Sequence, residues 1–141
     1  MNGLDGIGVQ VVTRDADDAS EANAWALLHE LDGMLDALLQ DGEESSIDLR
    51  SIPMTTADRE VLARVLGEGE LNASIDALGP SRVRETGIHG VWWVTHHNTD
   101  DAVIAEFLEV SFCPDILRSH IDDVRDTLES LRTQLVQHRE S

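Results

Sequence analysis

The side chains best suited to chemistry are histidines and one cysteine in the second half of the chain: His89, His96, His97 and Cys113. Imidazole nitrogen and thiolate sulfur are common ligands of zinc, nickel and iron. The spacing matches none of CxxC, HxxxH or HExxH. Consecutive residues of a regular strand point to opposite faces, so His96 and His97 would not share a metal. We expect turn and surface histidines, and keep His89, His96 and Cys113 as the metal candidates.

Catalysis and cofactor binding find no further support in the sequence. A nucleophilic Cys113 would need a histidine and an orienting group beside it. His120 is one to two helical turns away and is not expected to face Cys113. A single cysteine cannot supply the four thiolates of an iron–sulfur cluster. The chain also lacks a phosphate loop, a GxSxG elbow and a dinucleotide fingerprint. We therefore predict a protein that is not an enzyme and that carries no cofactor.

The adjacent tryptophans, Trp92 and Trp93, are better candidates for a functional surface. Alternation along a strand places their indoles on opposite faces of a sheet. If one face is open, an exposed indole would mark a contact site, because a large apolar surface is costly in water. If both faces are covered, both indoles belong to the core. The sequence leaves these two alternatives open.

The charge of the chain limits its partners. The 141 residues contain 28 acidic residues, 10 arginines and no lysine, which gives a formal net charge of −18. Nucleic acids and anionic membranes both require a basic surface, so neither is expected as a partner. The acidity would attract a cationic partner, although it would equally serve solubility alone.

Length and cysteine content indicate one soluble domain. A chain of 141 residues is long enough for its own core, and no apolar run approaches the roughly 18 residues that span a bilayer. The N-terminus lacks the basic start of a signal peptide, and the lone Cys113 fits a reducing compartment. We expect a cytoplasmic protein without membrane insertion, with a flexible arm at residues 1–18 and a single domain at 19–141.

Two amphipathic helices and a short strand are predicted in the first half. Apolar residues recur at helical spacing from Ser20 to Leu39, and Asp41-Gly42 ends that helix. Ile47 to Arg50 alternates like a strand. A second helix follows, with a capping box between Thr55 and Asp58, and Gly67 ends it.

The apolar period then changes to two, which predicts strands. Leu71 to Ala77 alternates, Gly79-Pro80-Ser81 is expected to turn the chain, and Val83 to His97 forms one long strand or two with a bend near Gly87 and Gly90. Val103 to Phe112 returns as a further strand.

A last helix is expected to open at Pro114, where the missing N–H costs little. Its apolar residues are spaced alternately by four and three: Leu117, Ile121, Val124, Leu128, Leu131 and Leu135. This seam suits a coiled-coil partner, but a seam this short more often packs on its own sheet, which we favour over dimerisation. Arg118–Asp122 and Arg125–Glu129 are expected to pair on its outer side.

Together these patterns predict an α+β fold with two layers. A twisted antiparallel β-meander of three to five strands is packed by about three helices, in the order α-β-α-β-β-β-α.

Two segments carry a resemblance to a known family. Ile47 to Pro53 reads IDLRSIP, and the stretch from Leu66 to Val94 contains LGEGE, RETGIHG and VWWV. This combination resembles the C-terminal region of the HupH/HyaF family of hydrogenase expression/formation proteins. A proline expected before the glycine of GVWW is His89 here. The matching residues are Ile47, Asp48, Leu49, Ser51, Pro53, Leu66, Gly67, Gly69, Glu70, Glu85, Thr86, Gly90, Val91, Trp92, Trp93 and Val94.

The resemblance implies a non-enzymatic chaperone or scaffold in the maturation of nickel–iron hydrogenase, acting on the iron–sulfur small subunit before export. It implies as partners that subunit or its twin-arginine signal, and a thioredoxin-like maturation protein. Our hypothesis is that the acidic surface and an exposed tryptophan receive the arginine-bearing, apolar signal. The partner-binding candidates are Glu85, Thr86, Gly90, Trp92 and Trp93.

Two alternatives belong to other functional classes. One is a protein that handles nickel or iron through His89, His96 and Cys113. The other is an interaction module that forms a homodimer through its last helix.

Overall fold

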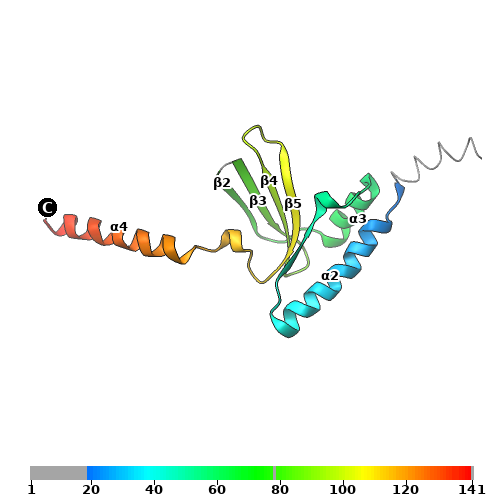
Figure 1. Cartoon of the computed structure of the whole chain (residues 1–141), viewed down its shortest axis with the longest axis horizontal. Coiled ribbons are helices and arrows are strands. Elements are labelled where there is room, and N and C mark those ends of the chain that lie inside the picture. The colour runs from blue at the N-terminus through cyan, green and yellow to red at the C-terminus, as the bar shows by residue number, and fades with distance from the viewer. Residues whose placement is uncertain (1–18, 78, 141) are drawn as a thin grey trace, which may run out of the picture.

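The computed structural model describes residues 19–77 and 79–140 (Figure 1), so the arm predicted at 1–18 lies outside the described residues. Its elements run in the order α2 (Ala22–Asp41), β1 (Ser45–Asp48), η1 (Leu49–Ser51), α3 (Thr56–Leu66), β2 (Asn72–Ala77), β3 (Gly79–Glu85), β4 (Val91–His97), β5 (Val103–Val110), η2 (Asp115–Leu117) and α4 (Ile121–Glu140).

The strands form an antiparallel sheet in the order β1-β5-β4-β3-β2, which confirms the predicted α+β meander. The stretch from Val83 to His97 belongs to two strands, so four strands follow α3 instead of three. The expected turn at Gly79-Pro80-Ser81 is wrong: these residues lie in β3, and Gly79 pairs with Ala77. Gly79 has φ +124°, and a side chain there would collide with the carbonyl of His97.

The predicted capping box at the start of α3 is confirmed and also joins two helices. The Thr55 hydroxyl accepts from the Asp58 N–H at 2.9 Å, and Asp58 Oδ2 accepts from the Thr55 N–H at 3.0 Å. Asp58 Oδ1 accepts from the N–H of Ala24 at 2.9 Å, in the first turn of α2. A local cap therefore fixes where α2 and α3 meet.

The strand predicted at Ile47–Arg50 begins and ends earlier, at Ser45–Asp48. The Asp48 carboxylate accepts from the Arg50 N–H at 3.0 Å, and this local bond favours a 3₁₀ turn over a continued strand.

The two faces of the sheet differ in what covers them. Helices α2 and α3 lie on one face, which we call the helix face (Figure 1). The main core there includes Leu27, Leu31, Leu62, Leu66, Trp93, Leu108 and Val110. The opposite face, which we call the open face, carries a smaller cluster of Val83, Trp92 and Val94, with Ala73, Phe107 and Leu117 packed against it.

The last helix departs most from expectation. It begins at Ile121, not at Pro114, because Pro114 adopts an extended ψ of 139° and leads into η2. All of its residues are exposed, and it extends away from the sheet (Figure 1), so the favoured packing on the domain's own sheet is wrong. Leu117 lies in η2 and packs on the open face instead of continuing the seam.

The ion pairs along the last segment also differ from the predicted ones. Arg118 pairs with Asp115 at 3.9 Å, and Arg125 pairs with Asp122 at 3.1 Å. Both arginines therefore reach back three residues, toward acids one turn nearer the N-terminus.

Candidate functional site

Four of the residues singled out from the sequence line one apolar cavity. It lies where β4 begins and β5 ends, beside the last turns of α2, and has a volume of about 330 Å³. We call it the sheet-end cavity. Its lining residues are Leu35, Leu38, Leu39, Glu85, His89, Gly90, Trp92 and Phe112.

The inner wall of the sheet-end cavity is rigid. Trp92 is only 5% exposed, and its indole N–H donates to the carbonyl of Ser111 at 3.0 Å. Gly90 has φ +92°, and a Cβ there would lie 3.3 Å from Leu35 Cδ2. Glycine is therefore required both for the backbone turn and for the close approach of α2.

Thr86 shapes the bend that carries Gly90 but does not line the cavity. Its buried hydroxyl lies 3.0 and 2.9 Å from the carbonyl oxygens of Ile88 and Val91, and accepts from the Ile88 N–H at 3.2 Å. The Thr86 N–H donates to the Val91 carbonyl at 3.1 Å. A threonine here satisfies the backbone of a tight bend, so we assign Thr86 a structural role.

Gly69 and Gly87 hold the bend in place through backbone hydrogen bonds. The Gly69 N–H donates to the Glu85 carbonyl at 2.9 Å, and the Gly87 N–H donates to the Leu66 carbonyl at 2.7 Å. A Cβ on Gly69 would lie 2.6 Å from the Thr86 carbonyl, and one on Gly87 would lie 2.9 Å from the Leu66 carbonyl. The segment after α3 and the bend thus pack backbone against backbone.

One carboxylate, that of Glu85, borders the sheet-end cavity. Glu85 lines it, and also lines a neighbouring hollow of about 70 Å³ together with Glu68 and Arg84. Glu85 Oε1 accepts from the Glu70 N–H at 3.2 Å, and Oε2 lies 4.0 Å from His89 Nδ1. The rim therefore carries one carboxylate and one imidazole, beside an apolar interior.

The outer wall is made by two residues that sequence reasoning missed. Leu39 is 74% exposed, and Phe112 is 68% exposed. Phe112 was assigned to a strand, but β5 ends at Val110. The available signal for Leu39 was its place directly after Leu38, the last buried residue of α2.

The tryptophan hypothesis is corrected by burial. Trp92 lies on the open face beneath Leu117 and its neighbours, and Trp93 is 7% exposed beneath the helices. Both indoles are therefore in the core, and an exposed indole at either position is wrong. Trp25 of α2, by contrast, is 44% exposed, with its N–H donating to Glu21 at 3.3 Å.

Trp93 belongs to a polar network on the helix face. Its indole N–H donates to Glu106 Oε2 at 2.8 Å, and Arg59 donates to Glu106 Oε1 at 2.9 Å. The Arg84 guanidinium lies 5.3 Å from the Trp93 ring centroid. Burial raises the pKa of Glu106, but the hydrogen bonds from Arg59 and Trp93 and the charges of Arg59 and Arg50 outweigh it and hold the pKa below its usual range.

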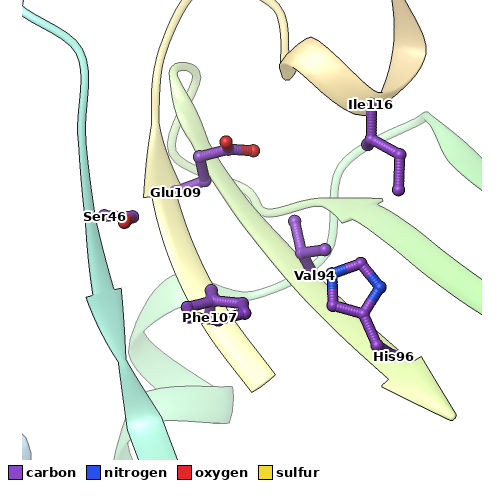
Figure 2. Close-up of a pocket in the computed structure, with 6 residues that line it drawn as sticks. All are labelled: Ser46, Val94, His96, Phe107, Glu109 and Ile116. Carbon is purple, nitrogen blue, oxygen red and sulfur yellow. The ribbon is translucent and has the colours of Figure 1, made fainter. Parts of the chain in front are cut away.

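A second cavity, of about 220 Å³, opens on the open face (Figure 2). It is lined by Ser46, Val94, His96, Phe107, Glu109 and Ile116. His96 Nδ1 lies 2.8 Å from the Ser81 hydroxyl, and the His96 and Phe107 rings pack edge to face with their centroids 6.1 Å apart. Burial, together with the charges of Asp115 and Glu44, raises the pKa of Glu109.

The structure does not bring the three metal candidates together. His89 lies at the rim of the sheet-end cavity, His96 lies in the cavity of the open face, and Cys113 follows β5, its thiol 3.8 Å from the Pro114 carbonyl. Within residues 19–77 and 79–140, no three histidine, cysteine or acidic side chains are grouped so that they could hold a metal ion.

Across the part of the chain that the structure describes, no helix has the length and apolar character needed to cross a membrane.

Comparison with known proteins gives a consistent family. Residues 22–137 match the family model described as HupH hydrogenase expression protein, C-terminal conserved region. The chain is similar to the hydrogenase expression/formation protein HoxQ of Azotobacter vinelandii, with 32% identity over 115 residues. It is also similar to HupH of Rhodobacter capsulatus, with 31% identity over 113 residues.

These alignments cover 78% and 80% of this chain but 40% and 41% of the relatives, so the chain spans about two fifths of their length. A solved structure of the hydrogenase expression protein HupH from Thiobacillus denitrificans is similar over most of this chain. It shares 38% identity with a TM-score of 0.78, covering 82% of this chain and 96% of that one.

Proposed function

This chain belongs to the HupH family of hydrogenase expression proteins, within its C-terminal conserved region, and from that premise we propose that it is a non-enzymatic maturation factor for nickel–iron hydrogenase. We propose that it acts in the cytoplasm as a chaperone or scaffold for the iron–sulfur small subunit before export. A thioredoxin-like maturation protein is a second proposed partner.

The sheet-end cavity carries this proposal. The part of the chain that carries the family resemblance, from the end of α3 through the bend to β4, builds its inner wall and its rim. The exposed side chains of Leu39 and Phe112 complete it with an apolar entrance. An apolar pocket with a few polar groups at its rim is the usual form of a specific binding site.

The chemistry of the cavity suits an apolar segment that carries arginine. One apolar side chain of the partner would enter between Phe112 and Leu39, while a guanidinium would meet Glu85 at the rim. Arginine binds carboxylates through paired N–H donors, which lysine cannot reproduce. The surrounding net charge of −18 would speed the encounter with a cationic segment.

The test is the affinity of this protein for the small-subunit precursor and for its isolated signal peptide, measured by fluorescence anisotropy. We expect binding of the signal peptide to weaken at least tenfold in Phe112→Ser and in Leu39→Ser, because each change removes apolar contact area at the entrance. Glu85→Gln should weaken binding of the arginine-bearing peptide but not of a variant with both arginines replaced by glutamine.

The matched control is Ile104→Ser, which removes another exposed apolar side chain far from the cavity and should leave the affinity unchanged. If neither the precursor nor the signal binds more tightly than an unrelated basic peptide at moderate salt, the proposal fails. If the precursor binds without its signal and the signal alone does not, the partner surface is the folded subunit.

A further inference from the structure

The last helix, α4, presents an apolar stripe that the chain's own domain leaves uncovered. All of its 20 residues are exposed. The large apolar side chains at three- and four-residue spacing are 41 to 67% exposed: Ile121, Val124, Leu128, Leu131 and Leu135. Most of the stability of a protein helix comes from packing of its apolar face, so covering this stripe would stabilise α4.

The positions of charge along α4 follow the same seven-residue repeat. With Ile121 as position a, the apolar residues fall at a and d, and His138 is the last d position. The five acids, Asp122, Asp123, Asp126, Glu129 and Glu140, all fall at the outer positions b, c and f. The three arginines of the helix, Arg125, Arg132 and Arg139, all fall at e, beside the seam. Thr127 and Gln134 occupy g, so the seam has no acidic flank.

We propose that α4 pairs with α4 of a second copy of this chain as a parallel two-stranded coiled coil. The helix carries five acids and three arginines, a formal charge of −2, so only a small part of the net charge of −18 lies on the two helices that would meet. Repulsion between the two acidic domains is screened at moderate salt.

The ion pairs that the arginines form within α4 favour a second copy over an acidic partner helix. Arg125 pairs with Asp122 of the same helix at 3.1 Å, and Arg132 pairs with Glu129 at 3.6 Å. These side chains reach back toward position b, so their charge is balanced within the helix. The partner helix therefore does not need acids beside its seam to balance these arginines, and a second copy of α4, which has none there, can pack against the stripe.

The same arginines determine the direction. In an antiparallel pair, e positions face e positions, which in the register that places Val124 opposite Leu135 would bring Arg125 of each copy near Arg132 of the other. In a parallel pair, e faces g, which brings Arg132 beside Thr127 and Arg139 beside Gln134 of the other copy. Like charges at close range are unfavourable, whereas an arginine beside a neutral polar residue is not.

The oligomeric state is measured by sedimentation velocity over a range of concentrations. We expect a concentration-dependent dimer, because just under three heptads form a short seam. Leu128→Glu with Leu131→Glu should give a monomer at every concentration, while Ser130→Glu with Thr133→Glu, at outer positions, should remain dimeric. Thermal unfolding of the domain should be unchanged in both, since α4 is exposed. A monomeric parent protein, or a dimer that survives the seam substitutions, overturns the proposal.

Direction is read from disulfide cross-linking in a Cys113→Ser background. Val124→Cys should cross-link to itself in a parallel pair, and Ser130→Cys should not. In an antiparallel pair Val124 would lie opposite Leu135, so cross-linking between Val124→Cys and Leu135→Cys chains would contradict the parallel assignment. None of these measurements involves the sheet-end cavity, so the dimer and the proposed partner binding succeed or fail separately.

Discussion

Trp92 and Trp93 are neighbours in the chain, yet their indoles are buried on opposite faces of the sheet, and their N–H groups donate to different residues. The Trp92 N–H donates to the Ser111 carbonyl at 3.0 Å, beside the sheet-end cavity. The Trp93 N–H donates to Glu106 at 2.8 Å, beneath the helices. One dipeptide thus joins the candidate site to the main core.

The hydrogen bond of Trp93 should contribute measurably to stability. Trp93→Phe removes the donor and leaves Glu106 bonded to Arg59 alone. We expect a loss of about 2 kcal/mol in the free energy of unfolding, measured by urea denaturation, from the lost charged hydrogen bond and the smaller ring. Trp25→Phe, at an exposed position, should change it by less than about 0.5 kcal/mol.

Gly90 and Gly33 give a matched pair of alanine substitutions with opposite expected signs. Gly90→Ala places a Cβ 3.3 Å from Leu35 Cδ2 in a backbone with φ +92°, and should destabilise the fold by about 1–3 kcal/mol. Gly33 lies inside α2 with open space around it, so Gly33→Ala should stabilise the fold by about 0.5–1 kcal/mol. Thermal unfolding of both variants checks the signs; stabilisation by Gly90→Ala would contradict the geometry of the bend.

Asp58 should cost more to remove than an ordinary cap residue. Its carboxylate accepts from the Thr55 N–H within α3 and from the Ala24 N–H of α2. Asp58→Ala leaves both donors without this partner, so we expect a loss of about 2–4 kcal/mol in the free energy of unfolding. Thr55→Ala removes the hydroxyl side of the box and the bond that the hydroxyl donates to the Ser20 carbonyl, and should cost about 1–2 kcal/mol. A loss for Asp58→Ala no larger than that for Thr55→Ala would contradict the expected contribution of the bond between Asp58 and Ala24.

Glu106 and Glu109 should influence the pH dependence of stability with opposite signs. The pKa of Glu106 is lowered on folding from 4.5, so its stabilisation is present above about pH 4.5 and is lost as the pH falls through the lower folded value. The pKa of Glu109 is raised by burial and by Asp115 and Glu44, so its ionised form is destabilising at neutral pH.

Substitutions by glutamine separate the two effects. Glu106→Gln should lower the melting temperature at pH 7, and the difference from the parent should shrink in acid. Glu109→Gln should raise the melting temperature at pH 7 by an amount worth less than about 1 kcal/mol, and this difference should also vanish in acid. Melting curves from pH 3 to pH 8 measure both, and shifts of the same sign at pH 7 would contradict this assignment.

Parts of the candidate site were predictable from the sequence. The family resemblance indicated Glu85, Gly90 and Trp92, and these line the sheet-end cavity together. Thr86 was indicated as well, but its hydroxyl is used by the backbone of the bend. Leu39 and Phe112 were missed, because their exposure depends on how α2 and the end of β5 meet in space.

What the sequence determined by itself was local order. The Thr55–Asp58 capping box, the glycine at the end of α2 and the alternation of the strands are set by residues within a few positions of one another. Such signals act through one turn of helix or one strand, so the sequence alone identifies them.

Tertiary structure decided which apolar surfaces were covered. The alternation at Trp92 and Trp93 was correct, but only the packing of α2, α3 and Leu117 on the two faces buried both indoles. The stripe of α4 was also correct, but the extended backbone at Pro114 and the start of the helix at Ile121 direct it away from the sheet. Periodicity specifies which side of an element is apolar, whereas burial depends on a second surface that is distant in sequence.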